Sequence, residues 1–91
     1  MYRCPMPGCS FTATKLWKVK EHFKLRHLPK LTHCPVCGEP VSPRTFTRHC
    51  YLRGDERHLL FYYLASAETT NRLLRGINGH AARIAQAQLA G

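Results

Sequence analysis

Two cysteines and two histidines near the start of the chain have the types and spacing of metal ligands. They are Cys4, Cys9, His22 and His27. Four residues separate the two cysteines, twelve separate Cys9 from His22, and four separate the two histidines. Structural zinc sites take thiolates and imidazoles at about this spacing and arrange them as a tetrahedron. The pattern therefore predicts one structural Zn2+ ion held by these four side chains.

A knuckle, a hairpin and a helix must position these ligands. The prolines and the glycine between the two cysteines favour a tight turn, because proline presets φ and glycine tolerates positive φ. We expect a short hairpin through residues 9–13 and a helix over about residues 15–26, with Thr12 or Thr14 as its N-cap. The two histidines lie five positions apart on this helix. Both can reach one metal if the last turn tightens or frays.

At these residues the sequence resembles the Cys2His2 zinc-finger family. The resemblance includes the small core of such a finger: Tyr2 stands two residues before the first cysteine, and Val19 stands three before the first histidine. Phe11 follows the second cysteine two residues earlier than in the commoner family pattern. The resemblance implies a ββα fold over residues 1–28. Because such a unit is too small to bury a sufficient core, the metal would decide its stability.

The resemblance also implies which residues would face DNA bases. Counted back from His22, the base-facing positions of the first helix fall on Lys15, Lys18 and Glu21. Lysine favours guanine or phosphate, whereas glutamate can accept a hydrogen bond from cytosine. Trp17 stands beside them. It would pack on the second unit, cap the core of its own finger, or stack on a nucleotide.

A second, divergent finger is expected over residues 34–58, after a short linker over residues 29–33. Its knuckle contains Cys34 and Cys37, separated by two residues, which in a reducing compartment indicates metal more often than a disulfide. Leu28 and Leu31 lie in the short connector between the two knuckles. Two leucines at this place indicate that the two units pack together.

The third ligand of the second unit follows from aligning residues 42–49 with the helix of the family. This register puts Phe46 at a buried position and His49 at the ligand position, and it favours His49 over Cys50, although Cys50 gives the more usual twelve-residue gap. Ser42 and Pro43 would open the helix as N-cap and first residue. The outward residues in this register are Arg44, Thr45 and Arg48.

The fourth ligand of the second unit is less regular. Gly54 can end one helix and Asp55 can cap the next, so the chain can turn back and bring His58 to the metal. We therefore prefer His58. The alternatives are Cys50, His33 or an incomplete site. With this ligand the chain would hold two structural Zn2+ ions in all.

The C-terminal part, residues 55–91, reads as a helical extension. We expect a helix from Asp55 to Arg75, which is apolar on every face between Leu59 and Ala65 and so belongs in a shared core or against another copy of the chain. The second of these two alternatives is a homodimer through the Leu59–Leu74 helix. The residues 77–79 predict a turn and residues 80–89 a last helix. The predicted fold class is a small zinc-stabilised α+β protein, with two ββα-type fingers packed together and a C-terminal helical hairpin.

The chain carries a large excess of positive charge. Fourteen lysine and arginine residues against five acidic residues give a net charge of +9, which favours a polyanionic partner over a merely basic soluble protein. We find no signal-peptide pattern and no apolar run of about 18 residues that would span a bilayer. We therefore expect no membrane contact and an intracellular location, in the nucleus if the source is eukaryotic and otherwise in the cytoplasm.

These patterns favour a DNA-binding transcriptional regulator whose finger helices lie in the major groove of double-stranded DNA. A module that binds proteins is the alternative, as is an RNA-binding protein that stacks bases on Trp17, Tyr51 or Phe61. We expect neither an enzyme nor a small-molecule substrate, because catalytic zinc needs an open coordination position. The predicted nucleic-acid contacts are Lys15, Lys18, Glu21, Lys24, Arg26, Arg44, Thr45 and Arg48.

Overall fold

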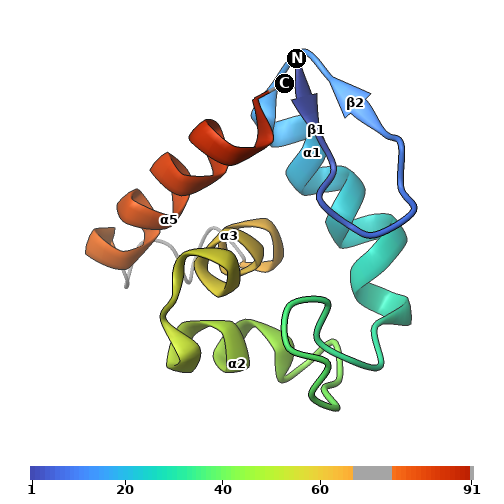
Figure 1. Cartoon of the computed structure of the whole chain (residues 1–91), viewed down its shortest axis with the longest axis vertical. Helices are drawn as coiled ribbons and strands as arrows, with labels where there is room; N and C mark the ends of the chain where they lie inside the picture. The colour runs from blue at the N-terminus through green and yellow to red at the C-terminus, as the bar shows by residue number, and fades with distance from the viewer. Residues whose placement is uncertain (67–74, 91) are drawn as a thin grey trace.

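A two-stranded antiparallel hairpin followed by a helix occupies the N-terminal part of the chain (Figure 1). The computed structural model describes residues 1–66 and 75–90. Strand β1 (Tyr2–Arg3) pairs with β2 (Thr12–Ala13), with Tyr2 opposite Ala13. Helix α1 (Leu16–His22) begins after Lys15, which caps it without a side-chain hydrogen bond. The prediction of a threonine cap is therefore wrong.

The helix does not end at His22 but changes its pitch. A π-helical turn (Phe23–His27) and a 3-10 turn (Leu28–Lys30) continue it, and the backbone N–H of Leu28 donates to the carbonyl of Phe23. This i→i+5 bond widens the turn. We expected the last turn to tighten or fray; widening solves the same problem, because residues five positions apart then share one face.

The second knuckle has no paired strands within residues 1–66 and 75–90. An isolated bridge joins His33 to Pro40 where a second hairpin was expected. Proline has no N–H to give to a strand ladder, and this segment carries prolines at positions 35, 40 and 43. Helix α2 (Phe46–Arg53) follows, capped by Thr45 after a turn that begins at Ser42, so that it starts later than the Ser42-Pro43 pair predicts.

Helix α3 (Glu56–Ala65) forms the centre of the molecule. Gly54 ends α2 at φ 74°, and the side chain of Asp55 accepts the backbone N–H of His58 at 3.2 Å, as predicted for this pair. The helix ends at Ala65 and not at Arg75, because Ser66 is extended. The hydroxyl of Ser66 donates a hydrogen bond to the carbonyl of Tyr63, in the last turn, at 3.2 Å. The rest of the predicted helix, residues 67–74, lies outside the described residues.

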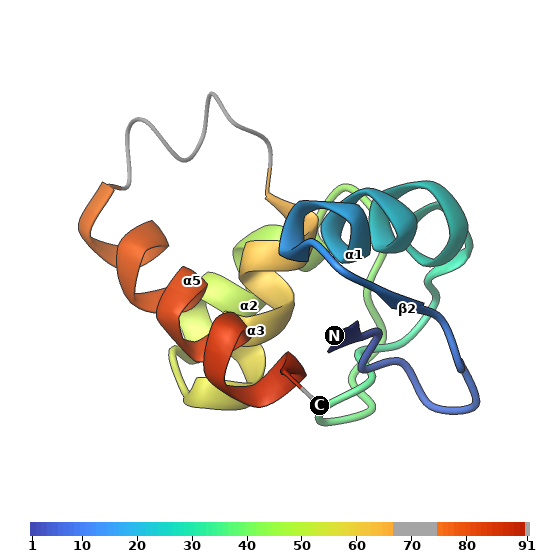
Figure 2. The same cartoon turned by 90° about the horizontal axis from the view of Figure 1, so that it is seen from above.

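Helix α5 (Arg75–Leu89) packs against α3 and runs back to the hairpin. The predicted turn at residues 77–79 is wrong, since these residues lie inside α5. Burial of one face of the helix outweighs the local preference for a turn: Ala81, Ile84, Ala85 and Leu89 are all buried. Ala90 then forms a bridge with Tyr2, so the two ends of the chain lie side by side (Figures 1 and 2).

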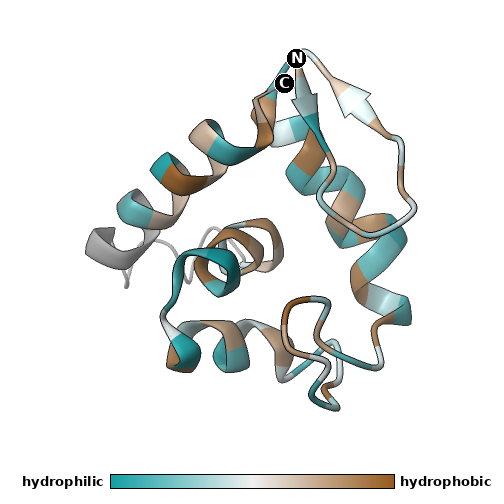
Figure 3. Ribbon diagram, in the orientation of Figure 1, coloured by the Kyte–Doolittle hydropathy of each residue, from teal (hydrophilic) through white to brown (hydrophobic). Residues whose placement is uncertain are grey.

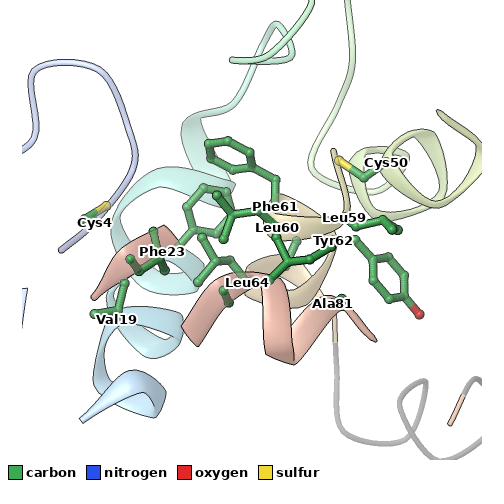
Figure 4. Close-up of a cluster of buried hydrophobic side chains, with 14 of the residues drawn as sticks. Cys4, Val19, Phe23, Cys50, Leu59, Leu60, Phe61, Tyr62, Leu64 and Ala81 are labelled. Atoms are coloured by element: carbon green, nitrogen blue, oxygen red, sulfur yellow. The ribbon is translucent and has the colours of Figure 1, made fainter. Parts of the chain in front are cut away.

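One hydrophobic core joins all of these elements (Figure 4). Seven of the ten residues of α3 are buried, in agreement with its apolar sequence, while α1, α2 and α5 pack around it (Figure 2). The rings of Phe23, Phe46 and Phe61 lie 5.8 to 6.2 Å apart, a usual distance for aromatic pairs. Leu31 of the connector is buried too. The prediction that the two knuckle units pack together is confirmed.

Hydrophilic residues alternate with hydrophobic ones along α1, α2 and α5, whereas α3 is hydrophilic mainly in its first turn (Figure 3). Within the described part of the chain, no helix has the length and apolarity needed to cross a membrane. The predicted homodimer stays untested. It would need a surface other than the buried side of α3, because the apolar residues at positions 59–62, 64 and 65 are already covered by the chain itself.

Candidate metal centres

The first predicted ligand set comes together at one point between the hairpin and α1. We call it cluster 1; it contains Cys4, Cys9, His22 and His27. One ligand atom of each lies within 4.8 Å of all the others. The Nε2 atom of His22 is 3.4 Å from the Sγ atom of Cys9 and 3.2 Å from the Nε2 atom of His27. Zinc ligands at 2.0 to 2.3 Å from the ion stand about 3.3 to 3.8 Å from one another. Cluster 1 can therefore hold a metal ion.

The π-helical turn is what brings the two histidines of cluster 1 together. In an α-helix, five residues correspond to about 140° beyond a full turn, which would point the two rings apart. The wider turn over Phe23–His27 removes most of that rotation. Phe11, from the hairpin, stacks flat on His22 with ring centroids 4.0 Å apart. The phenyl ring of Phe11 thus covers one face of the imidazole.

Burial tunes both kinds of ligand in cluster 1. Burial raises the pKa of the Cys4 thiol to about 11. A hydrogen bond from the backbone of Met6 acts to lower this pKa, and the neighbouring Cys9 acts to raise it. Burial lowers the pKa of His22, with a further effect from the positive charge of His27, and it lowers that of His27, with Lys30 adding to it. The imidazoles are therefore held neutral, which is the form that binds metal. The thiol must lose its proton when metal enters.

The second ligand set forms cluster 2, which contains Cys34, Cys37, His49 and His58. Their ligand atoms again lie within 4.8 Å of one another, and Sγ of Cys37 is 3.5 Å from Nε2 of His49. The two histidines come from different helices, α2 and α3. Gly54 makes this possible, because its left-handed conformation reverses the chain between the two helices. The structure thus brings the preferred fourth ligand, His58, to the other three.

The alternative ligands of the second unit lie elsewhere. Cys50 is fully buried in the hydrophobic core, and burial strongly raises the pKa of its thiol. His33 is exposed, and its Nδ1 atom lies 3.1 Å from the hydroxyl of Thr32. Neither belongs to the group of converging ligand atoms among the described residues.

A carboxylate holds each histidine of cluster 2 by its other ring nitrogen. The Nδ1 atom of His58 lies 2.5 Å from Oδ1 of Asp55, and the Nδ1 atom of His49 lies 3.1 Å from Oε2 of Glu39. Metal-binding histidines usually have such a partner, which fixes the tautomer and leaves the remaining nitrogen free to bind the ion. Among the described residues, the Nε2 atom of His58 is buried and has no hydrogen-bond partner. A metal ion at cluster 2 would satisfy it.

The two carboxylates are functional residues that the sequence interpretation did not identify. Asp55 was expected only as a helix cap, and no role was expected for Glu39. Glu39 also pairs with Arg53, at the end of α2. The sequence does contain a signal for Asp55. A carboxylate that stands three residues before a histidine at the start of a helix can both cap the helix and accept a hydrogen bond from the histidine ring. The partnership of Glu39 with His49 depends on how the knuckle docks on α2.

Each knuckle contains one glycine with positive φ. Gly8, at φ 78°, comes just before the second cysteine of its knuckle, whereas Gly38, at φ 77°, comes just after the second cysteine of the other. In cluster 2 the backbone N–H groups also act on the ligands: the N–H of Glu39, with help from His58 and His49, lowers the pKa of Cys37 to about 6. Burial wins over similar hydrogen bonds at Cys34 and raises the pKa of that thiol.

The donor sets fit zinc with all four positions filled by the protein. Two thiolates and two imidazoles per cluster are typical of structural sites, and a metal with four protein ligands has no position left for a substrate. When bound, each ion would supply only a cross-link. Over the described residues, the chain is thus a small α+β protein with a two-stranded sheet and two clusters that can each hold a structural metal ion.

The predicted nucleic-acid contacts fall into two groups. Most of them are exposed: Lys15, Lys18, Glu21, Arg26, Arg44, Thr45 and Arg48. Thr45 is tied to Ser42 by a network of hydrogen bonds at 3.1 to 3.4 Å. Lys24 differs from the others, because it is half-buried and its Nζ donates to the carbonyl of Ser66 at 3.4 Å. Trp17 is 58% exposed, so it does not pack on the second unit or cap its own core.

Comparison with known proteins adds no relative to this description. The chain matches no family model, no curated protein and no solved structure. The two clusters therefore carry the resemblance to Cys2His2 zinc fingers by themselves.

Proposed function

We propose that the chain is a zinc-stabilised DNA-binding protein in which cluster 1 presents the outer face of α1 to the major groove. The observation that carries this proposal is the division of α1 into two faces. Val19 and, one turn on, Phe23 are fully buried, whereas Lys15, Lys18 and Glu21 are exposed. These are the base-facing positions that the resemblance assigns. The first unit also has the order strand, strand, helix of a ββα finger.

The net charge supports a polyanionic partner. Of the positive side chains near α1, Lys15, Lys18 and Arg26 are exposed, so phosphates can reach them. The Nζ atom of Lys18 lies 5.8 Å from the centre of the neighbouring Trp17 ring. Others are engaged within the chain: Lys20 lies over the ring of Tyr63 at 4.7 Å, and Lys24 donates to Ser66. The proposed contact surface therefore contains fewer positive side chains than the sequence suggests. Lys15 and Lys18 lie at the N-terminal end of α1, and Arg26 lies on its π-helical extension.

The second unit would contribute fewer contacts. Arg44, in the turn before α2, and Arg48, on α2, are both exposed, and we propose that they neutralise phosphates or read a base. Thr45 already has its hydroxyl engaged with Ser42. Because α2 starts only at Phe46, the residues that would open a finger helix form a turn instead. A divergent second finger thus supports the first and adds charge.

A salt titration tests the proposal. Binding of the zinc-loaded chain to a fluorescently labelled duplex should weaken steeply as salt rises, because each phosphate contact releases counterions. The Lys18→Gln variant should bind more weakly and reduce the slope of the logarithmic salt plot by about 1. The Lys24→Gln variant is the matched control, since its ammonium faces Ser66, and it should bind like the parent. The absence of duplex binding at about 50 mM salt would overturn the proposal.

A protein-binding module is the second candidate, and one observation favours it. Trp17 is 58% and Leu25 67% exposed, and both lie on the outer face of α1 and its extension. Such residues are common where proteins meet. If the duplex titration fails while the chain stays folded with two metal ions, this candidate takes the place of the first.

A further inference from the structure

A groove lies on the outer side of α1, next to cluster 1 and outside the first-unit core. It measures about 350 Å³ and is lined by Phe11, Trp17, Lys18, Glu21, His22, Leu25 and Arg26. Two of the proposed base-facing residues, Lys18 and Glu21, belong to this lining, but Phe11, Trp17 and Leu25 have no part in the proposed base contacts. Its size is near the lower end of the range for sites that hold small ligands. It could therefore take one flat group and not a large one.

The lining combines an aromatic face with positive charge. Phe11 and His22 are half-buried and stacked on each other, while the indole of Trp17 stands 58% exposed. The Nζ atom of Lys18 is 5.8 Å from the centre of the Trp17 ring. Lys18 and Arg26 outnumber Glu21, the single acid of the lining. A fitting ligand has a planar, apolar face and carries negative charge beside it. A nucleotide has both.

The state of that nucleotide follows from the geometry of stacking. In a continuous duplex, both faces of each base are covered by its neighbours, and only the edges are open in the grooves. An aromatic side chain can cover a base face only where the base is unpaired or turned out of the stack. Trp17 offers an exposed ring and not a hydrogen-bonding fork, so it suits a base face better than a base edge.

We propose that the groove beside Trp17 binds one unpaired base, and that the preferred nucleic acid of this chain is one that offers such a base next to duplex or as single strand. This inference rests on the proposed function, because it names the form of nucleic acid that the same helix contacts. The charges of Lys18 and Arg26 would hold the flanking phosphates. A short apolar peptide fits less well, since the lining has two exposed apolar side chains, Trp17 and Leu25, set among charges.

The tryptophan itself provides the measurement. Trp17 is the single tryptophan of the chain, so its fluorescence reports on this groove alone. The zinc-loaded chain is titrated with three oligonucleotides of the same sequence: a full duplex, a duplex with one unpaired base, and a single strand. We expect strong quenching and tighter binding with the last two. Quenching with the full duplex should be weak.

Two pairs of variants separate stacking from folding. Trp17→Ala should lower the affinity for the unpaired-base duplex about tenfold or more, whereas Trp17→Phe should restore most of it, because a phenyl ring also stacks. Leu25→Ala should lower this affinity by a smaller factor. Its matched control is Leu52→Ala, equally exposed at 69% against 67% but outside the groove, which should change nothing. Zinc content confirms that each variant is folded.

The outcomes distinguish this inference from the proposed function. Equal affinity for all three oligonucleotides, without quenching and with no effect of Trp17→Ala, would overturn the inference and leave duplex binding in place. No binding to any of them at about 50 mM salt would overturn both. A fluorescence change with an acidic peptide, but with none of the oligonucleotides, would assign the groove to a protein partner and also overturn the inference.

Discussion

The two metal clusters use the same donor set but connect to the fold in different ways. In cluster 1 both histidines lie on one continuous helical segment, and their partners are a stacked phenyl ring and nearby positive charges. In cluster 2 the histidines lie on two helices, and each has a carboxylate on Nδ1. Within the described residues, neither His22 nor His27 has such a carboxylate. The first cluster shapes a local unit, and the second joins two helices of the core.

The same set of ligands can therefore stabilise one local unit or the whole fold. Loss of metal from cluster 1 would release the hairpin, while Val19 and Phe23 still hold α1 against the core. Loss of metal from cluster 2 would free His58 on the central helix, around which α1, α2 and α5 all pack. We therefore expect cluster 2 to be both the tighter site and the more important one for folding.

The largest expected effect comes from removing a ligand that belongs to the central helix. His58→Ala should lower the zinc count from two to one and abolish cooperative unfolding, because it removes most of an apparent binding free energy of about 10–16 kcal/mol. His27→Ala should also lose one zinc ion but keep the helical core. Native mass spectrometry and circular dichroism measure the two effects. Cys50→Ala is the control and should keep two ions; loss of one from this variant would show that Cys50 is a ligand.

The carboxylates of cluster 2 provide the next test. Asp55→Asn and Glu39→Gln should each weaken zinc binding at this cluster by about 10- to 100-fold, since outer partners of metal-bound histidines have effects of this size. Asparagine is as good an N-cap as aspartate, so Asp55→Asn separates the hold on the ring from helix capping. Competition with a chelator measures the affinity. The control is Glu21→Gln, because Glu21 lies near cluster 1 and forms no ion pair with a histidine among the described residues. This variant should leave the zinc affinity of both clusters unchanged. A loss of affinity equal to that of Asp55→Asn would contradict the comparison.

Acid should empty cluster 1 before cluster 2, because zinc needs thiolates and the pKa of Cys4 is raised to about 11, whereas that of Cys37 is lowered to about 6. Protons therefore compete with zinc for Cys4 at higher pH than for Cys37. Burial lowers the pKa of His22 and His27 below the ordinary 6.5, so the stability linked to these neutral imidazoles is lost only as the pH falls from about 6.5 through their folded pKa values. For Asp55, burial acts to raise the pKa, but hydrogen bonds with His58 outweigh it and the pKa falls below the ordinary 3.8. Its charge therefore persists to lower pH and continues to hold His58.

Zinc release during an acid titration measures this order. Trp17, beside cluster 1, should change its fluorescence when the first equivalent of zinc is released, and circular dichroism should change with the second. Release of both ions in one step, or loss of the helical signal with the first equivalent, would show that the clusters do not differ in the way we describe.

The smallest expected effect concerns what the clusters share. Gly8→Ala and Gly38→Ala should each cost about 1–2 kcal/mol of stability, because both residues have φ near 78° and a side chain disfavours this conformation. An added methyl group would meet no atom within 4 Å at either position. The costs should therefore be equal by thermal unfolding. A clear difference between the two stability costs would show that the knuckles themselves contribute to the difference between the two clusters.

The ligand sets could be predicted from the sequence because most of the cysteines and histidines have the spacing that is typical of zinc ligands. His58 followed from Gly54 and Asp55, which reverse the chain between two helices. The buried position of α3 followed from its apolar residues. Each of these features depends on a few neighbouring positions in the chain.

Other features depend on contacts between distant segments, and the sequence did not reveal them. The residues at 77–79 carry a strong turn signal, yet packing of α5 on α3 keeps them helical. The π-helical turn over Phe23–His27 brings two metal ligands together, and the sequence analysis did not predict it. The Glu39 contact with His49 joins a knuckle to a helix. The missing second hairpin could have been anticipated, because three prolines stand where its strands would pair.

Exhaustive chelation, with metal counted before and after by native mass spectrometry, addresses most directly whether bound ions hold this fold together. We predict two zinc ions per purified chain, and loss of both the helical signal and cooperative unfolding once they are removed. A chain that carries no metal, or that unfolds with the same midpoint and cooperativity after chelation, would contradict the account.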